Sequence, residues 1–291
     1  MNDYLVRGIV PSKNCRVFAC QTTELLEVAR QKHGLWPTAS AALGRMMSAT
    51  LMLAAMNKNH EKMTVTINGN GPIGTMIATT NSDGKIKAFV ANPEVHYTYN
   101  ETGKLAVGVA VGREGTLQVI KDMGLKEPFV GTVPLQSGEI GDDFSYYFMV
   151  SEQTPSVVSV GVLVNDTNEI LSSGGFIIQL LPEATEEDIV YIEDKMKDFP
   201  PVSSLIHDGK SPEDILSMLF DDVEILDKQD LSFECDCSKE QMKSALMTVG
   251  KTEIQSMIDE DHGCEMTCHF CNSRYQFSED ELKDLLNELD K

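Results

Sequence analysis

Four cysteines near the C-terminus constrain this chain more than any other feature of its 291 residues. They form a Cys-x-Cys pair and a Cys-x-x-Cys pair, separated by residues 238–267. The four residues are Cys235, Cys237, Cys268 and Cys271. Two close pairs at such a separation are typical of a tetrahedral site with four thiolate ligands, which usually holds structural zinc. We therefore predict one Zn²⁺ per chain, bound by these four cysteines in their reduced state.

A tetrathiolate zinc site has two interpretations. In most such sites the metal only holds a small domain together. Thiolates are also nucleophiles that an oxidant can attack, so the same sulfurs can act as a redox sensor. Sulfurs bound to one zinc lie about 3.8 Å apart, so loss of the metal leaves each local pair close enough to move into a disulfide. The spacing alone favours the structural role and leaves the sensor role open.

Charge argues against several classes of partner. Asp and Glu total 45 against 24 Lys and Arg, which gives a formal net charge of -21. This balance repels nucleic acid and anionic membrane surfaces, and acidic residues also outnumber basic ones around the cysteines. A zinc-ribbon nucleic-acid-binding protein is therefore only an alternative, which salt-sensitive binding to RNA or DNA would support. The N-terminus has no signal-peptide pattern, and no apolar run approaches the about 20 residues that a bilayer span needs. We expect a cytoplasmic protein with no nucleic-acid or membrane partner.

The first part of the chain, residues 1–181, predicts a mixed α/β core domain in an α+β fold. Strand-like runs cover residues 63–67, 85–90, 105–111 and 157–164, and helices are expected from 23 to about 34 and from 38 to 57. The second helix is rich in methionine and apolar almost all round its surface. We expect it to lie in the core, although methionine also serves surfaces that bind varied apolar partners.

Two smaller parts follow. Residues 182–230 are acidic, with capping residues at Thr185 and Ser211, and predict a helical linker that docks on the first domain because it cannot form its own core. Residues 231–291 form a small C-terminal zinc-binding domain. Its large aromatics are Phe233, Phe270, Tyr275 and Phe277. A domain with so small a core usually needs a cross-link such as a disulfide or a bound metal, and here zinc would supply it.

Other motifs predict less. Gly69, Gly71 and Gly74 match a dinucleotide-binding pattern, but Asn70-Gly71 reads as a hairpin turn with no capped helix after it. Cys268 and Cys271 have the spacing of a dithiol oxidoreductase without its βαβ context, which leaves an enzyme as an alternative to a binding protein. The remaining thiols are Cys15, Cys20 and Cys264. We expect the first two to be buried and inert, and the role of Cys264 is open.

The cysteine motifs and several other segments together resemble the redox-regulated 33-kDa bacterial heat-shock chaperones. The resemblance includes Phe270, Tyr275 and Phe277 around the second cysteine pair. It extends over essentially the whole chain, through Gly69-Asn70-Gly71-Pro72, Tyr146-Tyr147-Phe148, Ser151-Glu152-Gln153, Gly174-Gly175-Phe176-Ile177-Ile178-Gln179 and Leu219-Phe220. It favours the sensor role over a purely structural zinc site.

What the resemblance implies is an ATP-independent holdase rather than an enzyme. In such a protein, oxidation pairs Cys235 with Cys237 and Cys268 with Cys271, releases zinc, unfolds the C-terminal domain and destabilises the linker. The active form binds unfolding client proteins under oxidative and heat stress, and we expect it to be a homodimer. We expect residues 1–181 to carry client binding and dimerisation, with the linker contributing to client binding. Cys264 lies outside this pattern.

Overall fold

The computed structural model describes residues 2–57, 62–124 and 126–289. The chain forms two compact units, Met1–Glu234 and Cys235–Lys291. The ends of the first and third predicted parts, residues 1, 290 and 291, lie outside the described ranges. Residues 182–230, predicted as a linker, fall within the first unit. The functional division at residues 181 and 230 stays a prediction.

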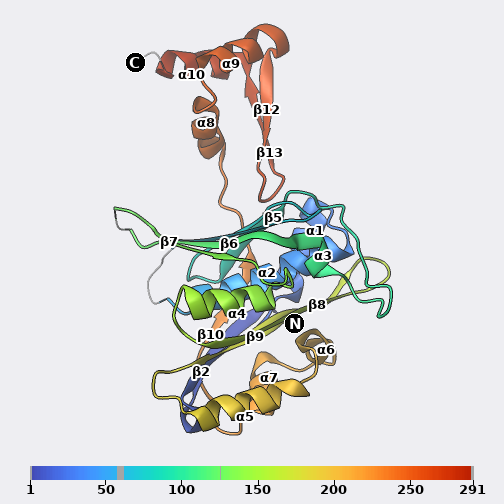
Figure 1. Ribbon diagram of the computed structural model, residues 1–291. Coiled ribbons are helices and arrows are strands. Elements are labelled where there is room, and N and C mark those ends of the chain that lie inside the picture. Colours follow the sequence, from blue (N-terminus) through green and yellow to red (C-terminus); the bar gives the residue numbers. More distant parts are fainter. Residues whose placement is uncertain (1, 58–61, 125, 290–291) are drawn as a thin grey trace. The chain divides into compact units, whose positions relative to one another are not determined.

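Two sheets build the first unit (Figure 1). The five-stranded sheet has the order β10-β1-β2-β9-β8, with β1 (Tyr4–Val10), β2 (Cys15–Gln21), β8 (Ser156–Val164), β9 (Ile170–Leu180) and β10 (Glu224–Asp230). The six-stranded sheet has the order β11-β5-β4-β3-β6-β7, with β3 (Lys62–Asn70), β4 (Met76–Thr80), β5 (Lys85–Val90), β6 (Gly112–Asp122), β7 (Phe129–Pro134) and β11 (Ser232–Phe233). All neighbours pair antiparallel except β11, which runs parallel to β5.

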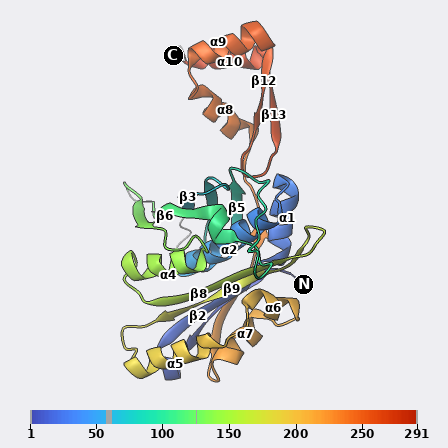
Figure 2. The same ribbon diagram turned by 45° about the vertical axis from the view of Figure 1, so that its right-hand side comes forward.

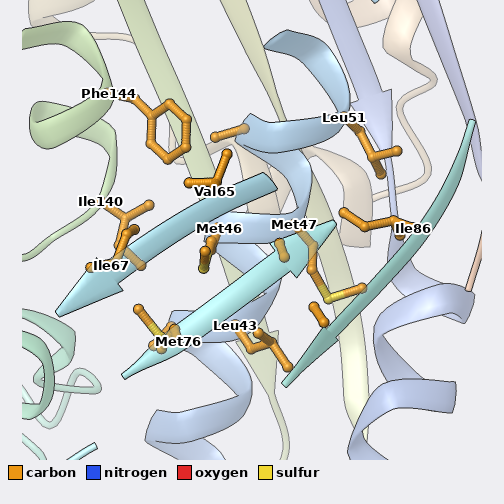
Figure 3. Packing of buried hydrophobic residues seen from close by; sticks show 14 of the residues in the cluster. Leu43, Met46, Met47, Leu51, Val65, Ile67, Met76, Ile86, Ile140 and Phe144 are labelled. Carbon is orange, nitrogen blue, oxygen red and sulfur yellow. The ribbon is translucent and has the colours of Figure 1, made fainter. Parts of the chain in front are cut away.

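Three helices fill the space between the sheets: α1 (Thr23–His33), α2 (Pro37–Ala54) and α4 (Gly141–Val150) (Figure 2). Helix α2 packs against both sheets, which is why its sequence is apolar all round. Within residues 38–54 only Arg45 is not buried, and its guanidinium pairs with Glu139 at 2.6 Å. Figure 3 shows Met46 and Met47 among core residues of the facing strands. The predicted core position of this methionine-rich helix is confirmed.

One predicted strand is wrong. Residues 107–111 form a short helix, α3 (Val107–Val111). The alternating valines suggested a strand, but Val107, Ala110 and Val111 are the buried residues, which is the spacing of one helical face. The carbonyls of Ala110 and Val111 accept hydrogen bonds from the turn that follows β3. Tertiary contacts therefore override the local strand pattern.

The acidic segment covers the outer face of the five-stranded sheet with α5 (Glu186–Lys197), α6 (Val202–His207) and α7 (Pro212–Leu219) (Figure 1). Thr185 and Ser211 cap α5 and α7 as predicted. The segment is not helical to its end, because residues 224–230 form β10, which pairs with β1. This strand completes a sheet edge, a long-range contact that the helical composition upstream did not signal.

The second unit contains α8 (Lys239–Met247), α9 (Lys251–Ser256), a single π-helical turn (Met257–Asp261), the hairpin β12 (Gly263–Thr267) and β13 (Arg274–Ser278), and α10 (Glu279–Leu289). Its buried core consists of Leu246, Ile254, Ile258, Phe277, Leu282 and Leu285. Phe233, expected in this core, instead lies in β11 and packs on the first unit beside His33. The small unit thus has even fewer aromatics than the sequence suggested.

A buried carboxyl at the start of α1 predicts a pH-dependent stability of the first unit. Asp3 is 4% exposed, and one of its oxygens accepts a hydrogen bond from the Leu25 N–H at 2.7 Å. Its other oxygen has no partner among the described residues. Burial, only partly offset by backbone hydrogen bonds, raises the pKa of Asp3 from 3.8 to about 6.

Because the folded pKa exceeds the unfolded one, this group stabilises the fold below pH 3.8, and its contribution is lost as pH rises through about 6. We expect Asp3→Asn, which keeps one acceptor, to remove a pH dependence on the order of 2 kcal/mol in this window. Urea unfolding of both proteins from pH 4 to 7 measures it. Parallel pH profiles for the two proteins would contradict the prediction.

Candidate metal centre

The turn between β12 and β13 carries the second cysteine pair. The Cys268 N–H donates to the Ser273 carbonyl at 2.9 Å, and the Asn272 N–H donates to the Cys268 carbonyl at 2.8 Å. Asn272 has a left-handed backbone with φ of 57°, a conformation that asparagine tolerates better than most residues. The turn therefore folds back on itself and presents both cysteine side chains on one side of the hairpin.

The first pair lies in the extended segment before α8. Ser238 follows this pair directly and caps α8 by accepting a hydrogen bond from the Gln241 N–H at 3.2 Å. The cap fixes where the helix begins, so Cys235 and Cys237 stay in extended chain. Extended chain lets both side chains of an i, i+2 pair point the same way.

The structure brings the four predicted cysteines together. Their Sγ atoms all lie within 4.8 Å of one another, and we call this group the tetrathiol cluster. Cys235 and Cys268 are 3.8 Å apart by Sγ, and Cys237 and Cys271 are 3.3 Å apart. A metal with thiolate bonds of about 2.3 Å requires sulfurs about 3.8 Å apart, so the cluster can hold one tetrahedral ion.

The chemistry of the donor set also fits a metal. Cys268 and Cys271 are buried, and Cys235 and Cys237 are half-buried. Burial raises the pKa of Cys235 and of Cys268. Burial acts the same way at Cys271, but hydrogen bonds with the Ser273 hydroxyl and N–H and with the neighbouring thiols of Cys237 and Cys235 outweigh it and lower the pKa of Cys271 to about 7. Thiolates are the form of cysteine that binds metals, so four clustered thiols, one of which ionises readily, form a suitable binding site for a cation.

Two hydroxyl groups at the cluster were not predicted from the sequence. The Tyr275 hydroxyl lies 3.1 Å from Cys237 Sγ and donates to the Cys237 carbonyl at 3.0 Å. The Ser273 hydroxyl lies 3.2 Å from Cys271 Sγ. The hydrogen bond with Cys237 raises the pKa of Tyr275 to about 12. Tyr275 lies four residues after Cys271 in the sequence, which predicts a place in the small core and carries part of the family resemblance, but does not predict a hydroxyl contact with a sulfur.

The other three cysteines lie elsewhere. Cys15 and Cys20 are in β2 and buried, and burial raises the pKa of each to about 12. This confirms the prediction of buried thiols. Cys264 lies in β12 opposite Phe277 and packs on the core of the second unit, and burial raises its pKa. It is not among the four clustered sulfurs.

Neither enzyme-like motif has the required context. The Cys268–Cys271 turn joins two antiparallel strands, not the strand and helix of a thioredoxin-like site. The glycine pattern at the end of β3 leads into β4 without an intervening helix. At Gly69 and Gly71 an added Cβ would collide with the backbone of residues 110–112, so these glycines permit close chain packing. Across the described ranges, no helix is both long enough and apolar enough to cross a membrane.

Comparison with known proteins agrees with this architecture. The Hsp33 protein family model matches residues 3–278. A 33 kDa chaperonin of Bacillus subtilis is 50% identical over 287 residues, covering 98% of this chain and 99% of the relative. A 33 kDa chaperonin of Lactiplantibacillus plantarum is 50% identical over 289 residues, covering 99% of this chain and 98% of the relative.

A solved structure is also similar. The crystal structure of a 33 kDa chaperonin (heat shock protein 33 homolog) from Thermotoga maritima has a TM-score of 0.93 and 36% identity, with both chains covered completely. The fold and the relatives define a chaperone class of protein with an α+β core and a small cysteine-bearing unit. The chain belongs to the Hsp33 family.

Proposed function

We propose that this protein is a redox-regulated, ATP-independent holdase whose tetrathiol cluster binds one Zn²⁺ in the reduced state. The observation that carries the proposal is the convergence of four thiols within 4.8 Å in a unit that has a very small core. When bound, Zn²⁺ would keep the sulfurs ionised and clustered, supplying folding free energy on the order of 10 kcal/mol. Its thiolate ligands would be Cys235, Cys237, Cys268 and Cys271.

Oxidation would act by removing these ligands. Local pairing of Cys235 with Cys237 and of Cys268 with Cys271 stays a prediction, since all four sulfurs are within reach of one another. Any pairing of the four sulfurs into two disulfides consumes every thiolate, so the second unit would lose the metal that holds it together. With six buried apolar side chains as its core, that unit would then unfold.

Unfolding would be transmitted through the chain that leads into Cys235. Residues just before it are anchored on the first unit by the β11–β5 pairing, by an ion pair between Lys85 and Glu234, and by Phe233 against His33. The preceding strand, β10, is exposed along nearly its whole length. The β11–β5 pairing joins only two residues of each strand, and β10 is exposed, so both would loosen when the unit after them unfolds.

The surface that loosening would expose is apolar. Helices α5–α7 cover a face of the five-stranded sheet that includes Val6, Val17, Phe176 and Ile178. Phe199 packs edge-on against Phe176 with ring centroids 5.5 Å apart. We propose that this face, with the released helices, binds unfolding client proteins, and that the active form is a homodimer acting in the cytoplasm, which keeps thiols reduced at rest.

Light scattering from a thermally unfolding client protein tests the proposal. We expect the oxidised, zinc-free protein to suppress aggregation and the reduced, zinc-loaded protein to leave it unchanged. Equal suppression in both states would mean a chaperone with a merely structural metal site. No suppression in either state would exclude the holdase function.

A further inference from the structure

The turn between β1 and β2, residues 11–14, contacts both ends of the segment that carries α5–α7. Before the segment, the Asn14 carbonyl accepts a hydrogen bond from the Leu181 N–H at 2.8 Å. After α7, the Ser12 N–H and the Ser12 hydroxyl each donate to the Asp222 carboxylate at 2.8 Å. Figure 1 and Figure 2 both show the blue end of this hairpin beside α5. One short turn therefore holds two places that are far apart in the sequence.

A third contact of the turn is with Asp188, in the first turn of α5. Asp188 is 5% exposed and accepts hydrogen bonds from the Thr185 N–H at 3.0 Å and the Thr185 hydroxyl at 2.9 Å. The β1–β2 turn supplies the Asn14 side-chain amide at 3.2 Å and the Lys13 ammonium at 3.8 Å. A carboxylate so far from water depends on its partners, so loss of the turn's two groups would weaken the docked position of α5.

Lys13 also lies over an aromatic ring that joins α5 to α7. Its ammonium is 4.3 Å from the centroid of the Tyr191 ring. The Tyr191 ring stacks on Phe220 with centroids 6.1 Å apart, and the Tyr191 hydroxyl donates to the Leu219 carbonyl at 3.1 Å. A cation over an aromatic face is attracted to it. Lys13 therefore restrains α5 and, through Tyr191, the end of α7.

All of these contacts lie within the first unit, and their partners in the linker come before β10. We propose that the β1–β2 turn is a clamp that holds α5–α7 on the five-stranded sheet and sets how often these helices open in the resting protein. The inference rests on the proposed function, because open helices would uncover the apolar face that is proposed to bind clients. Since the clamp belongs to the first unit, its strength is measurable without any oxidant.

Hydrogen exchange of the reduced, zinc-loaded full-length protein, read by mass spectrometry, tests the clamp. The variant combines Lys13→Met, which keeps an apolar stem, with Asn14→Gly, which keeps the left-handed backbone that Asn14 has at a φ of 46°. We expect amides at residues 186–219 to exchange about tenfold faster than in the wild type, because a cation and a hydrogen bond to one buried carboxylate are lost. Amides of α2, in the core, should keep their wild-type rates.

The matched control is Lys195→Met. The Lys195 ammonium lies 5.6 Å from the centroid of the same Tyr191 ring, but Lys195 belongs to α5 itself and makes no link to the turn. This variant should exchange like the wild type. Ser12→Ala, which removes one of the two hydrogen bonds to Asp222, should speed exchange at residues 186–219 by about threefold.

Unchanged exchange at residues 186–219 in the double variant would overturn the inference. An equal rise in Lys195→Met, or a rise that extends to α2, would also overturn it, because the turn would then have no specific hold on the helices. Exchange decides the clamp without a client protein. Client aggregation with oxidised wild-type protein, measured separately, reports a failure of the proposed function instead.

Discussion

Replacing Cys268 by serine is expected to abolish zinc binding and to unfold residues 235–291 while the first unit keeps its core. Cys268 is 4% exposed at the centre of the tetrathiol cluster, and serine is a poor ligand for zinc. The metal contributes on the order of 10 kcal/mol to a structural site, more than the six-residue core of this unit can replace. Zinc content and hydrogen exchange of the two units measure the result.

Cys264→Ser is the matched control for that experiment. Cys264 lies in the same hairpin but outside the cluster, so this variant should keep its zinc and its protected amides. A Cys268→Ser protein that retains one zinc per chain, or a Cys264→Ser protein that loses it, would contradict the ligand set. If Cys268→Ser also suppresses client aggregation when reduced, unfolding of the second unit is sufficient for activation.

Leu216→Ala is expected to activate the protein partly without any oxidant. Leu216 is fully buried in α7, within the apolar cluster that joins the linker helices to the five-stranded sheet. Truncating a buried leucine costs about 2–5 kcal/mol, because apolar contacts are lost and a cavity remains. That loss weakens docking of α7 on its sheet, so reduced, zinc-loaded protein should suppress client aggregation measurably.

Met218→Ala is the control on the same helix. Met218 is 41% exposed, so its truncation should leave docking and the resting state unchanged. Hydrogen exchange across residues 186–219 reports the docking directly, independently of the aggregation assay. Faster exchange in Leu216→Ala with no gain in reduced-state activity would mean that the face under α5–α7 is not the surface that binds clients.

The sequence predicted well those features that depend on local chemistry. The caps at Thr185 and Ser211 confirm the starts of α5 and α7, because a side-chain oxygen that accepts from the third helical N–H needs no distant partner. The four cysteines could be grouped from spacing alone, since few structures use two close pairs of thiols in another way. The methionine-rich helix could be placed in the core from sequence alone, because it is apolar almost all round its surface.

Features that depend on distant partners were predicted less well. Val107–Val111 has the alternation of a strand but is helical, because its backbone carbonyls meet the turn after β3. Phe233 was assigned by proximity to the cysteines, yet it pairs with β5 of the first unit. The edge strand β10 forms because it pairs with β1, which lies more than two hundred residues earlier in the sequence.

The features of the metal centre also fall into those that the sequence predicts and those that depend on the tertiary structure. The residues able to bind a metal, and the size of the unit that needs one, were determined by the sequence, because thiol chemistry and chain length are local properties. Which sulfur lies beside Tyr275 and which beside Ser273 was decided only by tertiary structure. The β12–β13 hairpin returns the chain to the first cysteine pair, and hydrogen bonds at about 3 Å form only once that return has placed the atoms.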